Sequence, residues 1–600
     1  MAADQGRYLR TAARTVPAWI RSNSMPEGGN LTMSPPIRGH KLALAFDGGD
    51  AVAMLARMTG GTVPFARRAL GAGKLAVSNA SAPLGAESLT LYLGQPLAAG
   101  PLPAPVTADQ ARSAFAELDG AFVALHWDAA AQVLTVASDF LGAMPLYWRR
   151  RSHGIALFTE TKAVEARPDP AGWGAFIGIG HPIGDRTLLE GVERFPPATV
   201  LHYDVRRNSV ALHRYWRWGD KPLSWRVQDF VECLAENVRA YSRQVDRHTV
   251  LLSGGLDSRL ILFLLQRLGI STRALIVTHD DELANADGRC AVAAAKAAAV
   301  PYEVCVPDAD YFDGPGFLRY LAAVDGEFPT LGLFISKLLP YVPDGGIWDG
   351  LVPGAVFMNL HNPGGGFARY RGSEIAGARA NQWQAAEGLF GVGRAQFMRE
   401  AFEAEFAACT KAYPDDAGGV ARFVLENRTR RRAAQNPLKA YANRATPFLP
   451  GMRRDLVEQA LAVPHSAKAG GSFYRRLLRE IHPRALDAPL FSGGQPVPRH
   501  GVDAAAIALR LRARLGLAAA RHPRLFRPMG RRTQSAALRI PEVARAYGMT
   551  DTDGWIDHQA LARLDPQSRE GFQIWRLYVH WAAWRTIHGS GGRALPFDTK

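Results

Sequence analysis

The six residues Ser253-Gly-Gly-Leu-Asp-Ser258 have the types and spacing of a loop that holds phosphate. Gly254 and Gly255 carry no Cβ, so the backbone can turn sharply and bring its N–H groups against anionic oxygens. Ser253 and Ser258 add hydroxyl donors, and a helix that begins near Ser258 directs its positive end at the same anion. The pattern therefore predicts a loop for pyrophosphate, formed by Ser253, Gly254, Gly255 and Ser258.

Asp257 stands among these donors and would repel phosphate unless a cation lay between them. Carboxylate oxygens bind Mg²⁺ well, so Asp257 is a candidate Mg²⁺ ligand. Such a site indicates ATP and Mg²⁺ as cofactors, with cleavage between the α and β phosphates that activates a carboxylate as its adenylate. The alternative is a plain tight turn between a strand and a helix. The spacing differs from G-x-x-x-x-G-K-[ST], which argues against a kinase or a GTPase.

The segments around this loop alternate between strand and helix patterns. An apolar run precedes the loop, and an apolar helical pattern follows at about residues 258–268. Further strands are expected at 271–278 and 302–306, with a helix over 287–300 between them. Alternation at this spacing predicts a parallel sheet with crossover helices. Asp287 is expected either to cap the second helix or to contact a ligand.

The chain before the loop has a different pattern. Residues 1–40 are polar and predict an N-terminal extension. Residues 41–218 consist of short apolar runs separated by Gly, Asp and Pro, which is typical of an all-β or mixed layered domain. Residues 219–600 form the second expected domain, mostly helical beyond about residue 310, and the aromatic stretch 572–584 is expected to be part of its core.

Composition excludes several classes of protein. The formal charge of +16 is spread along the chain without an RNA-binding module, so we expect no nucleic-acid partner. The four cysteines show no metal-binding spacing. No apolar stretch reaches the ~20 residues that span a bilayer, and no secretory signal is seen. These features predict a cytoplasmic protein without a membrane span.

The SGGLDS loop resembles the PP-loop of the ATP pyrophosphatases. The stretches 118–128, 134–147, 154–163, 184–197 and 214–216 together resemble the N-terminal glutaminase-like domain of the asparagine synthetase family. The resemblance covers roughly residues 110–310 well and the rest loosely. It implies an α/β chain, α+β overall. An Ntn-hydrolase-like layered β domain would be followed by a PP-loop ATP pyrophosphatase parallel-sheet domain with a helix-rich C-terminal extension.

Several residues depart from that family. Its glutamine-hydrolysing members use a Cys directly after Met, whereas position 2 is Ala and the first cysteine is Cys233. The resemblance thus implies an inactive amidotransferase-like domain. The family's second Mg²⁺ motif falls on residues 347–357, which puts Gly354 where an Asp is usual. Asp349 is the nearest carboxylate, and it is expected either to bind Mg²⁺ or to form a plain turn.

Two further departures distinguish the chain from the β-lactam synthetase-like members of the family. Leu351 stands where β-lactam synthetase-like members carry Tyr, and the stretch 490–496 lacks the Lys that steadies pyrophosphate in those relatives. Both count against a β-lactam synthetase, and the chain most resembles the lasso peptide cyclases. No general base is evident. Glu327 is expected to be either a base or, more simply, a solvated loop carboxylate.

The resemblance to lasso peptide cyclases implies a specific reaction. An Asp or Glu side chain of a precursor peptide would be adenylated, and the peptide's N-terminal amine would attack it to close a macrolactam. Partners would be the lasso precursor (core) peptide and a leader peptidase that matures it. Two alternatives stay open. One is a small-molecule amide or β-lactam synthetase, and the other is a non-catalytic nucleotide- or RNA-binding relative.

Overall fold

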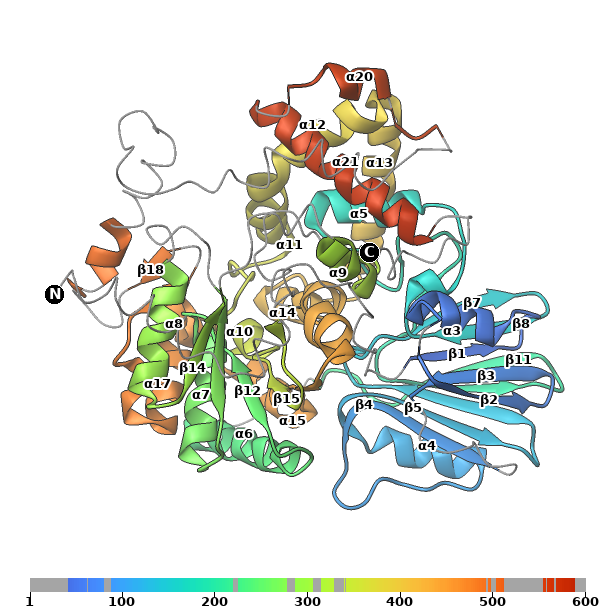
Figure 1. The fold of residues 1–600 in the computed structure, drawn as a ribbon, viewed down its shortest axis with the longest axis horizontal. Coiled ribbons are helices and arrows are strands. Elements are labelled where there is room, and N and C mark those ends of the chain that lie inside the picture. The colour runs from blue at the N-terminus through green and yellow to red at the C-terminus, as the bar shows by residue number, and fades with distance from the viewer. Residues whose placement is uncertain are drawn as a thin grey trace, which may run out of the picture.

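The computed structural model is a mixed α/β protein with antiparallel sheets towards the N-terminus, a parallel sheet and many helices (Figure 1). The predicted N-terminal extension, residues 1–40, lies outside the described residues. The structure describes residues 41–588 apart from gaps at 62, 80–87, 220–224, 278–285, 306–314, 329–338, 340, 493–494, 498–502, 505, 512–553, 557 and 566–567.

The N-terminal part contains two antiparallel sheets, in strand orders β2-β3-β1-β8-β7-β9 and β11-β10-β6-β5-β4. The first is formed by β1 (Leu42–Ala45), β2 (Phe65–Leu70), β3 (Gly73–Ser78), β7 (Tyr147–Arg151), β8 (Gly154–Phe158) and β9 (Glu193–Arg194). The second is formed by β4 (Leu89–Leu97), β5 (Asp119–Asp128), β6 (Val133–Ser138), β10 (Thr199–Asp204) and β11 (Ser209–Arg214). The helices here are α3 (Ala51–Thr59), α4 (Ala108–Ala116), η1 (Thr161–Ala163) and α5 (Pro170–Ile179).

Alternating side chains along the strands explain how these layers pack. In β1, Leu44 enters the core shared by the two sheets, whereas Ala43 packs on the α3 side. In β5, Val123 enters the shared core, whereas Phe122 packs against Phe115 of α4. Because successive side chains of a strand point to opposite faces, each sheet is covered once by the other sheet and once by a helix. This order gives four layers, and the Ntn-hydrolase-like description of them stays a prediction.

A five-stranded sheet follows in the order β14-β13-β12-β15-β16, and all of its pairs are parallel. Its strands are β12 (His248–Leu251), β13 (Arg273–Val277), β14 (Tyr302–Cys305), β15 (Gly346–Trp348) and β16 (Thr446–Phe448). Its first helices are α6 (Val227–Ser242), α7 (Leu256–Arg267), α8 (Ala286–Ala297) and α9 (Pro315–Ala323). The predicted parallel sheet is confirmed. The change of sheet type falls near the predicted domain boundary at 218, and the division into domains stays a prediction.

The remaining chain is mainly helical, as expected. Its helices are α10 (Pro353–Phe357), α11 (Phe367–Tyr370), η3 (Arg371–Ala376), α12 (Gly377–Phe390), α13 (Val392–Thr410), α14 (Ala417–Phe423), η4 (Val424–Ala433), η5 (Asn436–Ala440), η6 (Tyr441–Asn443), α15 (Arg454–Ala462), α16 (His465–Lys468), η7 (Ala469–Gly471), α17 (Ser472–Ile481), η8 (Pro483–Leu486), α20 (His558–Arg563) and α21 (Arg569–His588). A hairpin of β17 (Leu490–Ser492) and β18 (Gln495–Val497) lies among them. Within the described residues, none of these helices has both the length and the apolar character needed to cross a bilayer.

The aromatic stretch of α21 is part of the core, as predicted. Trp581 and Trp584 are fully buried and lie with ring centroids 4.5 and 5.0 Å from that of Trp173 in α5. Figure 1 shows α21 alongside α5, α12 and α13. The last helix that the structure describes therefore packs on a helix of the N-terminal part.

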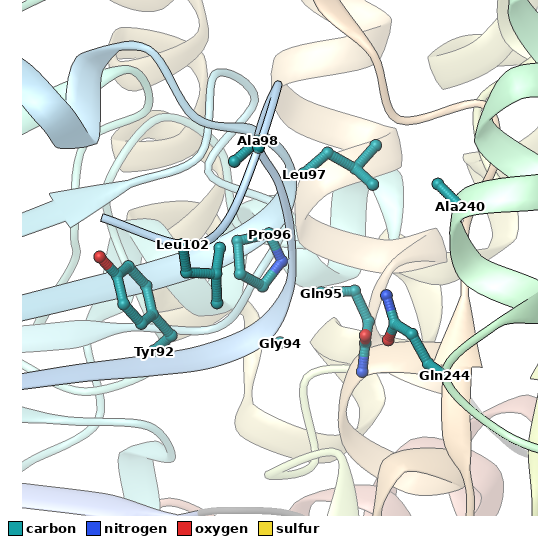
Figure 2. A pocket seen from close by; sticks show the side chains of 10 residues that line it. Tyr92, Gly94, Gln95, Pro96, Leu97, Ala98, Leu102, Ala240 and Gln244 are labelled. Atoms are coloured by element: carbon teal, nitrogen blue, oxygen red, sulfur yellow. The ribbon is translucent and has the colours of Figure 1, made fainter. Parts of the chain in front are cut away.

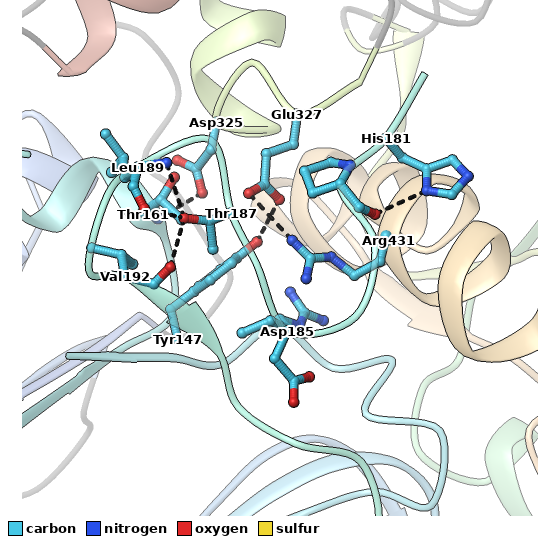
Figure 3. Close-up of polar contacts among 12 residues, drawn as sticks. Tyr147, Thr161, His181, Asp185, Thr187, Leu189, Val192, Asp325, Glu327 and Arg431 are labelled. Atoms are coloured by element: carbon cyan, nitrogen blue, oxygen red, sulfur yellow. Dashed lines mark hydrogen bonds and ion pairs between the residues drawn. The ribbon is translucent and has the colours of Figure 1, made fainter. Parts of the chain in front are cut away.

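A buried ion network joins the N-terminal sheets to the later helices (Figure 3). Asp325 is inaccessible to solvent and accepts the backbone N–H of Thr161 at 2.8 Å. Its carboxylate also binds Nζ of Lys162 at 3.1 Å and Nζ of Lys439, in the π-helix η5, at 2.6 Å. Burial opposes ionisation of Asp325, but the two lysines outweigh it and hold the pKa of that carboxyl well below its usual range.

Glu327 belongs to the same network. The Tyr147 hydroxyl donates to its Oε2 at 2.8 Å, Gln435 donates at 3.3 Å, and Nη2 of Arg431 lies 3.7 Å from its Oε1 (Figure 3). Glu327 is fully buried, so its expected place as a solvated loop carboxylate is wrong. The reason is that η4 and β7 close over the turn that carries it.

We expect Asp325→Ala to lower the free energy of unfolding by about 3–5 kcal/mol, because the substitution leaves Lys162 and Lys439 buried without their carboxylate. Since folding lowers the pKa of Asp325, its contribution is complete above the unfolded value of about 4 and declines as the pH falls below it. Urea unfolding at pH 7 and at pH 3 measures both effects. The control is Asp109→Ala, which removes an exposed ion pair with Arg112. Equal stability of the two variants at pH 7 would contradict the assignment.

Candidate functional site

The predicted phosphate loop lies at the carboxyl end of β12, the central strand of the parallel sheet. β12 ends at Leu251 and α7 begins at Leu256, so residues 252–255 form the loop between them. The expected order of strand, loop and helix is confirmed. The first N–H groups of α7 have no carbonyl partner within the helix, and the positive end of its dipole lies at the loop. This edge of a parallel sheet is where ligands commonly bind.

The two serines hold the loop closed on itself. Oγ of Ser258 accepts the backbone N–H of Ser253 at 3.0 Å, and the two hydroxyl oxygens are 3.1 Å apart. Oγ of Ser253 also accepts the N–H of Gly255 at 3.3 Å. The structure thus shows both serines setting the shape of the loop, and their contact with pyrophosphate stays a prediction.

Gly254 is required by close packing rather than by its backbone angles. A Cβ on Gly254 would lie 2.5 Å from Cβ of Cys290 in α8 and 2.8 Å from Cβ of Phe491 in β17. Its N–H donates to Oδ1 of Asp287 at 2.9 Å. Asp287 lies in the first turn of α8, which begins at Ala286, so the predicted N-cap role is wrong. Burial raises the pKa of Asp287, and the Gly254 hydrogen bond opposes that rise.

Arg259 fastens a distant segment to the loop. Its guanidinium is fully buried and donates to the carbonyls of Ala488 at 2.8 Å and Pro489 at 2.7 Å. The carbonyl of Gly254 lies 3.4 Å from the same guanidinium and accepts the N–H of Phe491 at 3.0 Å. These hydrogen bonds place Pro489 and Phe491 beside the loop, and the sequence of 490–496 contains no lysine.

Two carboxylates meet at this edge of the sheet. Asp257 is in the first turn of α7, and Asp349 directly follows β15, the strand next to β12. Burial raises the pKa of Asp257 to about 7, and the charge of Asp349 adds to the rise. Burial also raises the pKa of Asp349 to about 6. Both groups thus lie where a negative charge is disfavoured unless a cation compensates it.

The segment after β15 packs directly on Asp257. A Cβ on Gly354 would lie 2.5 Å from Oδ2 of Asp257, and a Cβ on Gly350 would lie 2.6 Å from Cβ of Asp257. Between them Val352 has φ +83°, a left-handed conformation that a β-branched residue rarely adopts. The stretch 347–357 therefore packs on the first turn of α7, with Gly354 against Asp257, and its role in binding Mg²⁺ stays a prediction.

The residues present fit a magnesium ion bound together with phosphate. Mg²⁺ prefers oxygen ligands, and proteins often supply one or two carboxylates while phosphates and waters complete the octahedron. Asp257 and Asp349 would be those two carboxylates. Among the residues that the structure describes, no group of three or more His, Cys, Asp or Glu side chains could hold a metal ion.

Sequence reasoning missed one polar partner of this site. The hydroxyl of Tyr474, in α17, donates to Oδ1 of Asp257 at 2.7 Å. The sequence around Tyr474 predicts only an amphipathic helix, because nothing within it shows which distant residue its buried face meets.

A cavity elsewhere in the chain does not include the predicted site. It has a volume of about 420 Å³ and lies between the edge strand β4 and the end of α6, lined by Gln95, Leu97, Ala240 and Gln244 among others (Figure 2). None of the predicted loop or metal residues lines it.

Residues 106–216 match the model of a glutamine amidotransferase domain family. The match covers α4, β5 and β6 and continues to the end of β11, so it falls within the antiparallel layers. Residues 1–232 contain no cysteine.

Relatives found by sequence are amide-forming synthetases by name. The chain is 31% identical over 133 residues to the carboxyethyl-arginine beta-lactam-synthase of Streptomyces clavuligerus, covering 20% of this chain and 24% of that protein. It is 28% identical over 159 residues to asparagine synthetase [glutamine-hydrolyzing] 3 of Bacillus subtilis (strain 168), covering 24% and 25%. The chain spans about a quarter of the length of these curated relatives. These matches support an asparagine synthetase-like family.

The NMN synthetase from Francisella tularensis aligns with 33% of this chain and 78% of its own, at 11% sequence identity and a TM-score of 0.14. The PP-loop description of the parallel-sheet domain therefore stays a prediction.

Gly350→Ala tests the close packing on Asp257. The added methyl group would meet the Cβ and backbone of Asp257, so we expect a loss of about 1–3 kcal/mol in the free energy of unfolding. Gly393→Ala is the control, because a Cβ there has open space in α13 and alanine favours a helix. Chemical denaturation measures both variants. A Gly350→Ala protein as stable as the control would show that the segment is not packed as described.

Proposed function

We propose that the chain is an ATP-dependent, amide-forming synthetase that activates a carboxylate as its adenylate. The main support for this proposal is the position of Asp257 and Asp349. Both lie beside the Ser253–Ser258 loop, at the carboxyl edge of a parallel sheet. The names of the two relatives agree with it, since one makes asparagine and the other a β-lactam.

Each part of the site has a role in this proposal. The first N–H groups of α7, with Ser253, Gly254, Gly255 and Ser258, would bind the pyrophosphate portion of ATP. Asp257 and Asp349 would hold Mg²⁺, which neutralises phosphate charge when bound. The substrate carboxylate displaces pyrophosphate from the α-phosphorus and forms an acyl adenylate. An amine then attacks the carbonyl carbon of this adenylate, AMP leaves with the bridging oxygen, and the nitrogen loses a proton to solvent.

We propose further that the amine belongs to the same molecule as the carboxylate, as in the macrolactam ring of a lasso peptide. The absence of cysteine from residues 1–232 favours an amine supplied by the substrate over ammonia from glutamine. A site that holds both ends of one peptide gains rate through proximity, because a flexible peptide rarely brings them together. The lasso precursor peptide and its leader peptidase are the partners that this proposal requires.

A second candidate is a synthetase for a small-molecule amide or β-lactam. The identity to the carboxyethyl-arginine beta-lactam-synthase favours it. Against it, Leu351 replaces the expected tyrosine and is buried in the core, so its side chain offers no hydroxyl to a substrate.

ATP–pyrophosphate exchange tests the proposal. The full chain should exchange labelled pyrophosphate into ATP only when a carboxylate substrate and Mg²⁺ are present. Asp257→Ala should abolish both exchange and ring closure while the protein remains folded, because the loop keeps its shape through the two serines. Normal ring closure by this variant would mean that the Mg²⁺ assignment is wrong.

The choice of added acid separates the candidates. Exchange that depends on a precursor peptide supports the cyclase, and exchange with small amino-acid derivatives alone supports the second candidate. Absence of exchange with every acid tried, together with steeply salt-dependent RNA binding, would support a non-catalytic nucleic-acid-binding relative instead.

A further inference from the structure

Tyr474 is the partner that the structure gives Asp257 outside its own helix. Its hydroxyl donates to Oδ1 of Asp257 at 2.7 Å, and its side chain is fully buried. The ring packs edge-on against Phe357 of α10, with centroids 5.5 Å apart. Because the ring is held by packing, the hydroxyl has a fixed position from which to orient the carboxylate.

The two oxygens of Asp257 have different surroundings. Oδ1 receives the Tyr474 hydroxyl, whereas no described residue donates a hydrogen bond to Oδ2, which packs against Gly354. An added Cβ at position 354 would lie 2.5 Å from Oδ2, so only glycine fits there. Oδ2 is therefore the oxygen that remains available to a cation.

Gly354 offers Asp257 no side chain, so the hydrogen bond from Tyr474 is the contact that fixes the rotation of this carboxylate before a metal binds. Ligating carboxylates are commonly hydrogen-bonded by neighbouring groups, and loss of such a group weakens metal binding by about 10- to 100-fold.

We propose that Tyr474 is a positioning residue that orients Asp257 so that Oδ2 faces the metal. The inference rests on the proposed function, since it takes Asp257 to be an Mg²⁺ ligand. Tyr474→Phe removes the hydroxyl and keeps the ring, so the packing on Phe357 is retained.

The experiment uses the full chain and Mn²⁺ as the probe, titrated alone and followed by electron paramagnetic resonance. Tyr474→Phe should weaken Mn²⁺ binding by about tenfold. The matched control is Tyr413→Phe, which removes a tyrosine–carboxylate hydrogen bond of 2.6 Å to Glu426, far from the loop in sequence. The control should bind Mn²⁺ like the unchanged protein. A purely structural role for Tyr474 predicts a lower unfolding temperature with unchanged Mn²⁺ affinity, which would overturn the proposal.

Asp257→Ala separates this inference from the function on which it rests. Loss of Mn²⁺ binding in Asp257→Ala but not in Tyr474→Phe would reject only the role of Tyr474. Unchanged Mn²⁺ binding in Asp257→Ala would reject the metal site itself, and with it both proposals.

Discussion

The arrangement of the candidate site depends on one buried guanidinium. Arg259 lies in the first turns of α7 and binds carbonyl groups at residues 485, 488 and 489, more than 200 positions later in the chain. A buried arginine without acceptors would be costly, so these carbonyls and the guanidinium fix each other's place. The same contact brings Phe491 onto the carbonyl of Gly254. The Ser253–Ser258 loop and the segment 485–491 beside it are therefore one unit, although neither sequence alone shows it.

Local patterns predicted much of this region because their physical causes are local. The apolar run before Ser253, the small residues of the loop and the helical pattern after it gave strand, loop and helix in the right order. The spacing of the next strands gave a parallel sheet, which then places Asp257 and Asp349 at one edge. The structure adds a reason for Gly254 that the sequence did not suggest, since glycine permits the close approach of Cys290 and Phe491.

The sequence patterns did not predict the contacts between distant segments. From the sequence, Tyr474 is predicted only to lie on the buried side of an amphipathic helix. The structure shows that its hydroxyl donates a hydrogen bond to Asp257. Glu327 reads as a polar residue in a Gly- and Pro-containing turn, yet β7 and the π-helix η4 bury it completely. Asp287 reads as a helix cap because it begins a helical pattern, while its actual partner is the amide of Gly254. In all three cases the partner lies more than 30 positions away.

The contact between Asp287 and Gly254 gives the loop a further property. The amide of Gly254 is already occupied by an anionic oxygen of the chain itself. Any anion that reaches this amide must displace a carboxylate, so its binding is an exchange rather than the filling of an empty place. At this amide, only the difference in free energy between the hydrogen bond to the anion and the hydrogen bond to Asp287 contributes to the affinity for the anion. If the loop binds an anion, such an exchange would discriminate against weakly held anions such as chloride and would favour a polyanion that gains several other contacts at the same time.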